Sequence, residues 1–305
     1  MVRKAILAAF AALTLATPVA AETLSVETYR PARNESALGV HSLAVERFRG
    51  PEGSRFSFML ADTLQQVAIR GQPWFTVLVN ERGDADAMLE GEVRPRISES
   101  RFRRKREVCW TEDENGECTE ERKVEMDCIR LRVSVRPDLR LVARGGALLW
   151  TSPLEQHREE SFCPEVDDYP DVRALVSRML ADLARDIRRE LAPTGSFEPV
   201  RIMESRSGLT GESRDMFRDA VRLTKSDEVA ACEMFERLHA ANPEQPSLMF
   251  NVGLCAERRG DHREAQARYR AALASERSDD EASAGLRRID DTAEAFSQIA
   301  FHFEQ

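Results

Sequence analysis

The C-terminal third of the chain repeats with a period of 34 residues, and this repeat constrains the fold more than any other feature. Three small or apolar positions recur at that spacing: Ala231 and Ala265, Phe235 and Tyr269, Leu238 and Ala272. A period of this length is typical of arrays in which each unit is a pair of helices. We therefore predict an all-α helical array over residues 212–297, in preference to a set of unrelated helical hairpins.

The second unit of this array resembles a known helical repeat. Its small and aromatic positions match those of tetratricopeptide repeats (TPR): Gly253, Gly260, Ala265, Tyr269 and Ala272. Two units and a third helix, expected over residues 279–296, fall short of the roughly three repeats that independent stability requires. The resemblance implies a concave groove lined by the first helix of each pair. Phe217, Asn251 and Arg258 are its candidate partner-binding residues.

Two cysteines of the array are placed to form a disulfide. Cys232 lies eleven residues before Pro243, and Cys255 lies twelve residues after it. Pro243 falls in the predicted turn between two antiparallel helices. Because each helical residue rises ~1.5 Å, the two cysteines lie at nearly the same height on facing helices. We expect a bridge here, in preference to two buried free thiols.

The first 21 residues have the pattern of an export signal. Arg3 and Lys4 precede an apolar stretch over residues 5–15, and the small residues Ala20 and Ala21 precede Glu22. The stretch is too short for a membrane anchor, and no cysteine follows that could carry a lipid. We predict a Sec-type signal peptide over residues 1–21. The mature chain would then be periplasmic or secreted, without a transmembrane span, in an oxidising compartment where cysteines pair.

The middle of the chain predicts an α+β domain over residues 38–192. Short runs of apolar residues predict strands at 42–48, 74–79, 87–93, 129–135, 139–142 and 147–151. Helical spacing of apolar residues predicts helices over 54–71 and 171–191. This order predicts a mixed sheet with helices on one face. We interpret residues 22–37 as an irregular lead-in, 193–211 as a linker and 298–305 as a tail.

Four cysteines belong to the α+β domain, and they allow three connectivities. Cys109 and Cys118 flank an Asn-Gly pair, so their local pairing is favoured. Cys128 would then pair with Cys163. A metal site is the alternative, but the cysteines lack C-x-x-C spacing and clustered histidines. We predict disulfides, and no metal or other cofactor.

A charged hairpin over residues 94–127 contains a run of basic residues from Arg101 to Arg106. Arg103, Arg104 and Arg106 are candidate contacts for an anionic partner. The alternative is neutralisation within the hairpin. A two-residue turn at Asn115-Gly116 would place Arg104 opposite Asp127 and Arg106 opposite Glu125, and we favour this alternative.

Three segments of the α+β domain have sequence patterns that resemble those of a known family. They are Leu43-Ala-Val-Glu-Arg-Phe48, Trp74-Phe-Thr-Val-Leu-Val79 and Ala85-Asp-Ala-Met-Leu-Glu-Gly-Glu-Val93. Residues 42–191 thereby resemble the domain shared by the curli secretion protein CsgG and the penicillin-binding-protein activator LpoB. The resemblance implies a non-catalytic module of envelope assembly or partner activation. Hairpin 94–127 does not alternate apolar and polar residues, so a secretion-channel role is disfavoured.

The net charge and the lack of catalytic motifs exclude several classes of function. A formal charge of −9 and a pI near 5.3 argue against nucleic-acid binding. The sequence contains no Gly-rich phosphate loop, G-x-S-x-G or H-E-x-x-H motif. We predict a non-catalytic periplasmic adaptor that binds envelope proteins through both domains. The alternatives are a structural subunit of an envelope assembly or secretion machine, and an envelope enzyme with an interdomain site.

Overall fold

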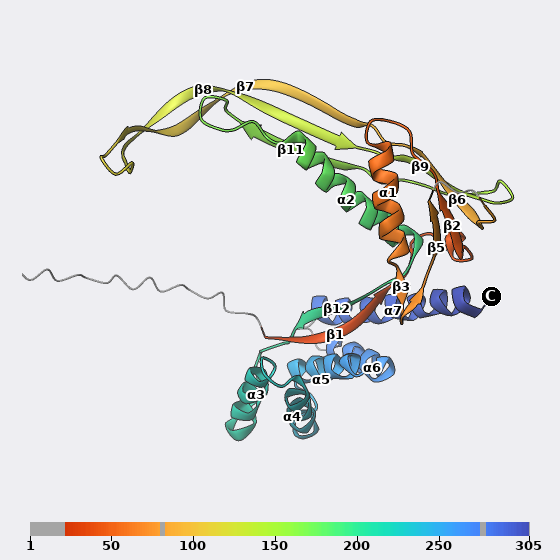
Figure 1. The fold of residues 1–305 in the computed structure, drawn as a ribbon. Coiled ribbons are helices and arrows are strands. Elements are labelled where there is room, and N and C mark those ends of the chain that lie inside the picture. Colours follow the sequence, from red (N-terminus) through yellow and green to blue (C-terminus); the bar gives the residue numbers. More distant parts are fainter. Residues whose placement is uncertain (1–21, 80–82, 275–278, 305) are drawn as a thin grey trace, which may run out of the picture. The chain divides into compact units, whose positions relative to one another are not determined.

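The computed structural model describes residues 22–79, 83–274 and 279–304 (Figure 1). The chain divides into two compact units. The helical unit comprises residues up to Glu27 together with Phe197–Ile289, and the α/β unit comprises Thr28–Ser196 together with Asp290–Gln305. The predicted signal peptide, residues 1–21, lies outside the described residues.

The α/β unit contains a mixed five-stranded sheet in the order β10-β9-β6-β2-β5. Its strands are β2 (Ser42–Val45), β5 (Thr76–Val79), β6 (Ala87–Glu92), β9 (Asp138–Ala143) and β10 (Leu148–Thr151). Strand β2 is parallel to β5 and β6, whereas β9 is antiparallel to β6 and β10. The prediction of a mixed sheet is confirmed.

A second, antiparallel sheet is built on a long hairpin (Figure 1). Strands β7 (Pro95–Glu112) and β8 (Cys118–Val135) form the hairpin, and β11 (Gln156–Phe162) pairs with the other edge of β8. Leu131, Val133 and Val135 alternate with polar residues and are buried in the core. This period-two pattern is what a sheet with one covered face requires.

Two helices complete the core of the α/β unit. Helix α1 (Gly53–Gln65) and helix α2 (Val172–Leu191) place apolar side chains at helical spacing into the same hydrophobic cluster as the sheets. Helix α2 begins at a polar cap, because the Asp171 side chain accepts a hydrogen bond of 3.0 Å from the Ala174 N–H. Asp171 is the residue at which the sequence predicts the start of this helix.

The predicted lead-in and linker both contain a strand. Strand β1 (Thr23–Arg30) pairs with β12 (Thr194–Arg201), and a short hairpin, β3 (Ala68–Ile69) with β4 (Gln72–Pro73), follows α1. Leu24, Val26 and Thr28 alternate into buried positions along β1. Two apolar residues are too few for a recognisable period, so the interpretation of residues 22–37 as a lead-in and of 193–211 as a linker did not predict these strands.

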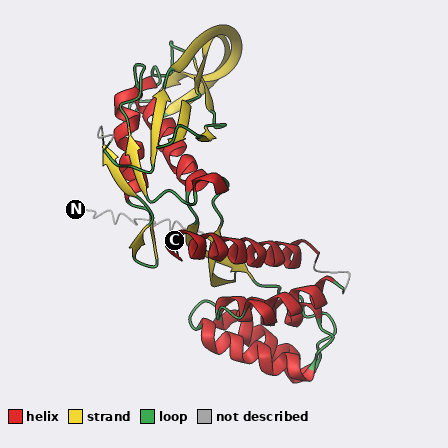
Figure 2. Ribbon diagram, turned by 90° about the vertical axis from the view of Figure 1, so that its right-hand side faces the viewer, coloured by secondary structure: helices red, strands yellow, loops and turns green. Residues whose placement is uncertain are grey.

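Most of the helical unit is formed by helices, which accompany its parts of β1 and β12 (Figure 2). They are α3 (Gly211–Leu223), α4 (Glu228–Ala241), α5 (Pro246–Arg258), α6 (His262–Leu273) and the first part of α7 (Asp279–Glu304). Asp227, Gln245 and Asp261 cap α4, α5 and α6 by accepting backbone N–H bonds from three residues later. Phe217, Phe235, Phe250 and Tyr269 are fully buried in its core.

The predicted tail, residues 298–305, is helical as far as Glu304, which corrects its assignment. The last turns of α7 belong to the α/β unit and bury Ile299 and His302 there. The two ring nitrogens of His302 lie 2.7 Å from the Leu38 carbonyl and 2.9 Å from the Trp74 carbonyl. The Gln298 side chain accepts a hydrogen bond from the Ala32 N–H and donates one to the Ala32 carbonyl. These partners are distant in sequence, so local pattern could not reveal them.

Candidate interaction surfaces

The structure contains three disulfides: Cys109–Cys118, Cys128–Cys163 and Cys232–Cys255. The prediction of disulfide bonds is confirmed, and the three pairs are those that the sequence favours. Two of them fasten the charged hairpin of the α/β unit. The third joins α4 to α5 in the helical unit.

The turn of the hairpin differs from the predicted two-residue type. The Asp113 N–H donates to the Glu117 carbonyl at 2.9 Å, and the Asp113 side chain accepts from the Asn115 and Glu117 N–H groups. Gly116 adopts a φ of +81°, in the left-handed region that favours glycine. The longer turn shifts the register of the two strands by one residue. Each residue of β7 therefore lies opposite a different residue of β8 from the one predicted.

The shifted register changes the partners of the basic run. Arg103, rather than Arg104, lies opposite Asp127 and bonds to it at 3.2 Å, and Lys105 lies opposite Glu125. Arg104 lies opposite Met126. Within the described part of the chain, Arg104 is exposed and makes no ion pair. The predicted pairs of Arg104 with Asp127 and of Arg106 with Glu125 are therefore wrong.

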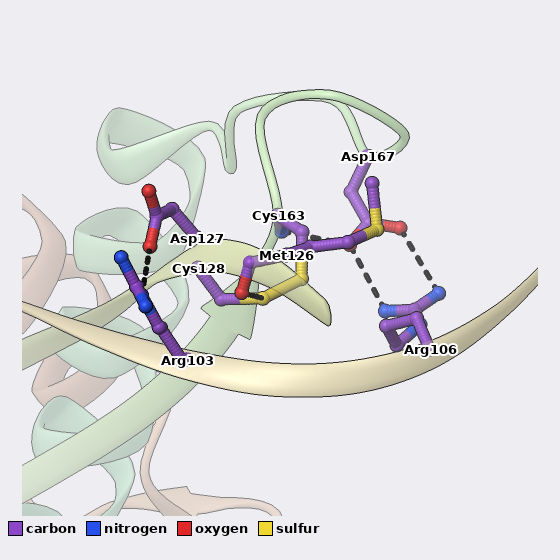
Figure 3. Close-up of a disulfide and its surroundings, with 7 residues drawn as sticks. All are labelled: Arg103, Arg106, Met126, Asp127, Cys128, Cys163 and Asp167. Atoms are coloured by element: carbon purple, nitrogen blue, oxygen red, sulfur yellow. Dashed lines mark hydrogen bonds and ion pairs between the residues drawn. A yellow bond between two sulfur atoms is a disulfide. The ribbon is translucent and has the colours of Figure 1, made fainter. Parts of the chain in front are cut away.

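Arg106 pairs with a residue outside the hairpin. Its guanidinium donates two hydrogen bonds, of 3.1 and 3.4 Å, to the Asp167 carboxylate (Figure 3). Asp167 also accepts a 2.8 Å bond from the N–H of Cys163, whose side chain forms the disulfide with Cys128. The Cys163 N–H and the nearby Arg106 hold the pKa of the Asp167 carboxyl below its usual value. A disulfide and an ion pair thus fix the loop 163–167 onto the hairpin.

The far end of the hairpin carries an exposed tryptophan that the sequence analysis did not single out. The Trp110 side chain is 58% exposed and lies next to the Cys109–Cys118 disulfide. The Arg122 guanidinium lies 4.4 Å from the centroid of the Trp110 ring, within cation–π range. The sequence signal that could have indicated Trp110 is an aromatic residue beside a cysteine in an otherwise charged hairpin.

In the helical unit, two of the three predicted groove residues are engaged in the fold. Phe217 is fully buried in α3, where its ring packs edge-on against Phe235, so its assignment to an open groove is wrong. Arg258 bonds to the Glu228 carboxylate at 2.6 Å and thereby joins α5 to α4. Aromatic and charged residues at helical spacing look the same in sequence whether they face a core, a neighbouring helix or a partner.

The third predicted residue, Asn251, holds a segment of this chain. Its side-chain oxygen accepts a 2.8 Å bond from the Met203 N–H, and its side-chain nitrogen donates a 2.9 Å bond to the Met203 carbonyl. Six residues earlier in the chain, at the N-cap of α5, the Gln245 side chain donates to the Ser205 carbonyl at 2.8 Å. Asn251 is fully buried and Gln245 is 6% exposed. Helix α5 therefore presents two buried amides to the main chain of an extended segment.

A buried charged cluster, which no sequence motif predicts, lies deeper in the helical unit. Arg288 of α7 donates bonds of 2.8 and 2.7 Å to the Glu257 carboxylate of α5, and the Tyr269 hydroxyl of α6 bonds to the same carboxylate at 2.5 Å. Burial and the adjacent Glu257 raise the pKa of the Tyr269 hydroxyl. The hydroxyl therefore donates to Glu257, and this carboxylate links the three helices.

The described residues offer neither a metal centre nor a membrane-spanning helix. They contain no group of three or more His, Cys, Asp or Glu side chains placed to hold a metal ion. Among these same residues, no helix combines the length and apolar character that crossing a membrane requires.

Comparison with known proteins gives a weak structural likeness. Neither known protein-family models nor curated proteins match the sequence. Among solved structures, the chain is similar to a PelC dodecamer from Paraburkholderia phytofirmans, with 11% identity and a TM-score of 0.24, over 54% of this chain and 98% of that one. A likeness this weak supports no statement about function.

Proposed function

We propose that the protein is a non-catalytic adaptor of the cell envelope, which binds one protein partner through each of its units. The observation that carries this proposal is the pair of buried amides on α5. Asn251 and Gln245 bind main-chain groups of an extended segment, and such bonds recognise a peptide backbone without regard to its side chains.

The proposed helical unit is a short TPR-like array. In support, α4 and α6 begin at Glu228 and His262, which are 34 residues apart. The paired positions of the repeat are also equally buried: Ala231 and Ala265, Phe235 and Tyr269, Leu238 and Ala272. Arrays of this class bind peptides on their concave face.

The proposed role of the α/β unit is docking by a CsgG/LpoB-like module, with the hairpin as its contact surface. Arg104 is exposed on the stem, and Trp110 is exposed at the tip, where aromatic residues often anchor interfaces. The three disulfides fit an oxidising compartment outside the cytoplasm, and we propose the periplasm.

The test is photo-crosslinking in cells, with crosslinking residues placed at Arg104 on the hairpin and at Arg206 next to the α5 amides. Both positions are exposed, whereas Asn251 itself is buried. We expect each position to capture a distinct envelope protein, identified by mass spectrometry. Glu233, exposed on α4, is the matched control. Capture of copies of this chain alone would favour an assembly subunit, and capture of nothing at both positions would contradict the adaptor proposal.

A further inference from the structure

Residues 202–207, here called the strap, lie across the start of α5 and are held there by their main chain. The strap contributes four main-chain atoms to side chains of α5: the Met203 N–H and carbonyl to Asn251, and the Ser205 and Ser207 carbonyls to Gln245, the last at a long 3.5 Å. The side chains of residues 204–207 are exposed. The middle of the strap is therefore bound without any buried side chain of its own.

The buried apolar side chains lie at the two ends of the strap rather than along its length. Ile202 is 3% exposed at the start, and Leu209, just beyond the strap, is also 3% exposed. Both belong to the core of the helical unit. Segments with few buried apolar contacts open locally at a free energy well below that of global unfolding. The stretch between these anchors can therefore leave α5 while the helices stay folded.

A hollow remains beside the strap. It has a volume of about 370 Å³, and its apolar lining comes from Ile202, Met203 and Pro246. Arg201, Ser247 and Glu281 supply polar lining. Glu204, Ser205 and Ser207 of the strap also line the hollow, but their side chains are exposed and leave it open. An extended segment with a bulky apolar side chain could use the same main-chain bonds and also fill the hollow.

We infer that the strap is a built-in occupant of a peptide-binding groove, and that an extended partner segment with a bulky apolar side chain replaces it. This inference rests on the proposed adaptor function and names the chemistry of the partner of the helical unit. Buried Asn251 and Gln245 supply backbone recognition, and the hollow supplies the preference for an apolar side chain. The strap keeps both amides satisfied while no partner is bound, because a buried unpaired amide is costly.

The first experiment uses the mature full-length protein and a fluorescent synthetic peptide with the sequence of residues 199–209. Met203→Pro removes the N–H that bonds to the Asn251 side chain and leaves Asn251 and Gln245 unchanged. We expect this variant to bind the peptide at least tenfold more tightly than the wild type. Glu204→Pro is the matched control, since within the described residues the Glu204 N–H makes no hydrogen bond. Adding Asn251→Ala to Met203→Pro should abolish binding.

Equal binding by Met203→Pro and the wild type, or binding that survives Asn251→Ala, would overturn the inference. Hydrogen exchange of the wild type provides a second test that needs no variant. We expect the Met203 N–H to exchange at least tenfold faster than the core amides of α5. Exchange of both at the same rate would mean that the strap opens only by global unfolding, and would also overturn the inference.

The outcomes separate this inference from the adaptor function. If crosslinking captures an envelope partner while the strap fails to open, the adaptor function stands and the strap is a fixed part of the fold. If the strap opens and takes up the peptide while no partner is captured, the groove is established and the adaptor function fails.

Discussion

Glu257 shows how one residue can hold three helices together. A carboxylate that is 3% exposed has lost its hydration, and this loss is costly unless every oxygen finds a donor. Here the two oxygens receive two bonds from Arg288 and one from Tyr269. Gly285 and Gly253 make room for the Tyr269 ring, because a Cβ at Gly285 would lie 2.5 Å from that ring. The cluster therefore depends on small residues as well as on charge.

Glu257→Gln should strongly destabilise the helical unit. The variant keeps the shape of the side chain but leaves the Arg288 charge buried without a counter-charge. We expect the free energy of unfolding to fall by about 3–5 kcal/mol, measured by chemical denaturation. Glu236→Gln is the control, because Glu236 makes an exposed ion pair with Arg259 and should cost less than about 1 kcal/mol. Equal effects of the two variants would show that the buried cluster is no stronger than a surface pair.

At the scale of elements, the hairpin is the clearest case of a structure that needs support from elsewhere. A two-stranded hairpin is marginally stable in water by itself. Near its base, the odd-numbered residues of β8 are covered by the main core, whereas farther out the even-numbered Met126 and Cys128 are covered by the loop that contains Cys163. The Asp167–Arg106 pair and a disulfide hold that loop in place (Figure 3). Asp167 should therefore matter to hairpin stability in a pH-dependent manner.

Folding lowers the pKa of Asp167, so the folded chain binds its proton less readily than the unfolded chain. Its stabilisation is present above the ordinary carboxyl pKa of 3.8 and is lost as the pH falls below it. We expect Asp167→Asn to lower the thermal midpoint at pH 6, with a much smaller difference from the wild type at pH 3. Asp168→Asn, at the exposed neighbouring carboxylate, is the control. An Asp167→Asn effect of the same size at both pH values would refute this account.

The elements also show what the sequence can and cannot predict. Asp171 predicts the start of α2, and the alternation over 129–135 predicts the covered part of β8, because both signals are local. The hairpin register was missed by one residue, because the Asp113 side chain organises a longer turn than the Asn-Gly pair requires. Asn251 was selected as a groove residue, but its occupant, Met203, lies 48 residues away, and no local pattern links them.

At the scale of the whole molecule, the two units have separate hydrophobic cores. One core contains side chains of α1, α2 and the two larger sheets. The other contains side chains of α3 to α6 and of the first part of α7. Helix α7 contributes to both units: its residues up to Ile289 belong to the helical unit, and those from Asp290 belong to the α/β unit. The proposed adaptor would benefit from this arrangement, since each unit can be stabilised by its own contacts.

Removal of the Cys232–Cys255 disulfide tests whether the cores are energetically separate. This bridge closes a loop with a sequence separation of 23 residues. The chain-entropy model predicts a loss of about 3 kcal/mol when it is removed. In the double variant Cys232→Ala and Cys255→Ala, we expect faster hydrogen exchange in α4 and α5 but unchanged exchange in α2. Cys109→Ala with Cys118→Ala, which removes the bridge at the hairpin tip, is the matched control and should leave α4 and α5 unaffected. If α2 loses as much protection as α5, the two cores unfold as one cooperative structure.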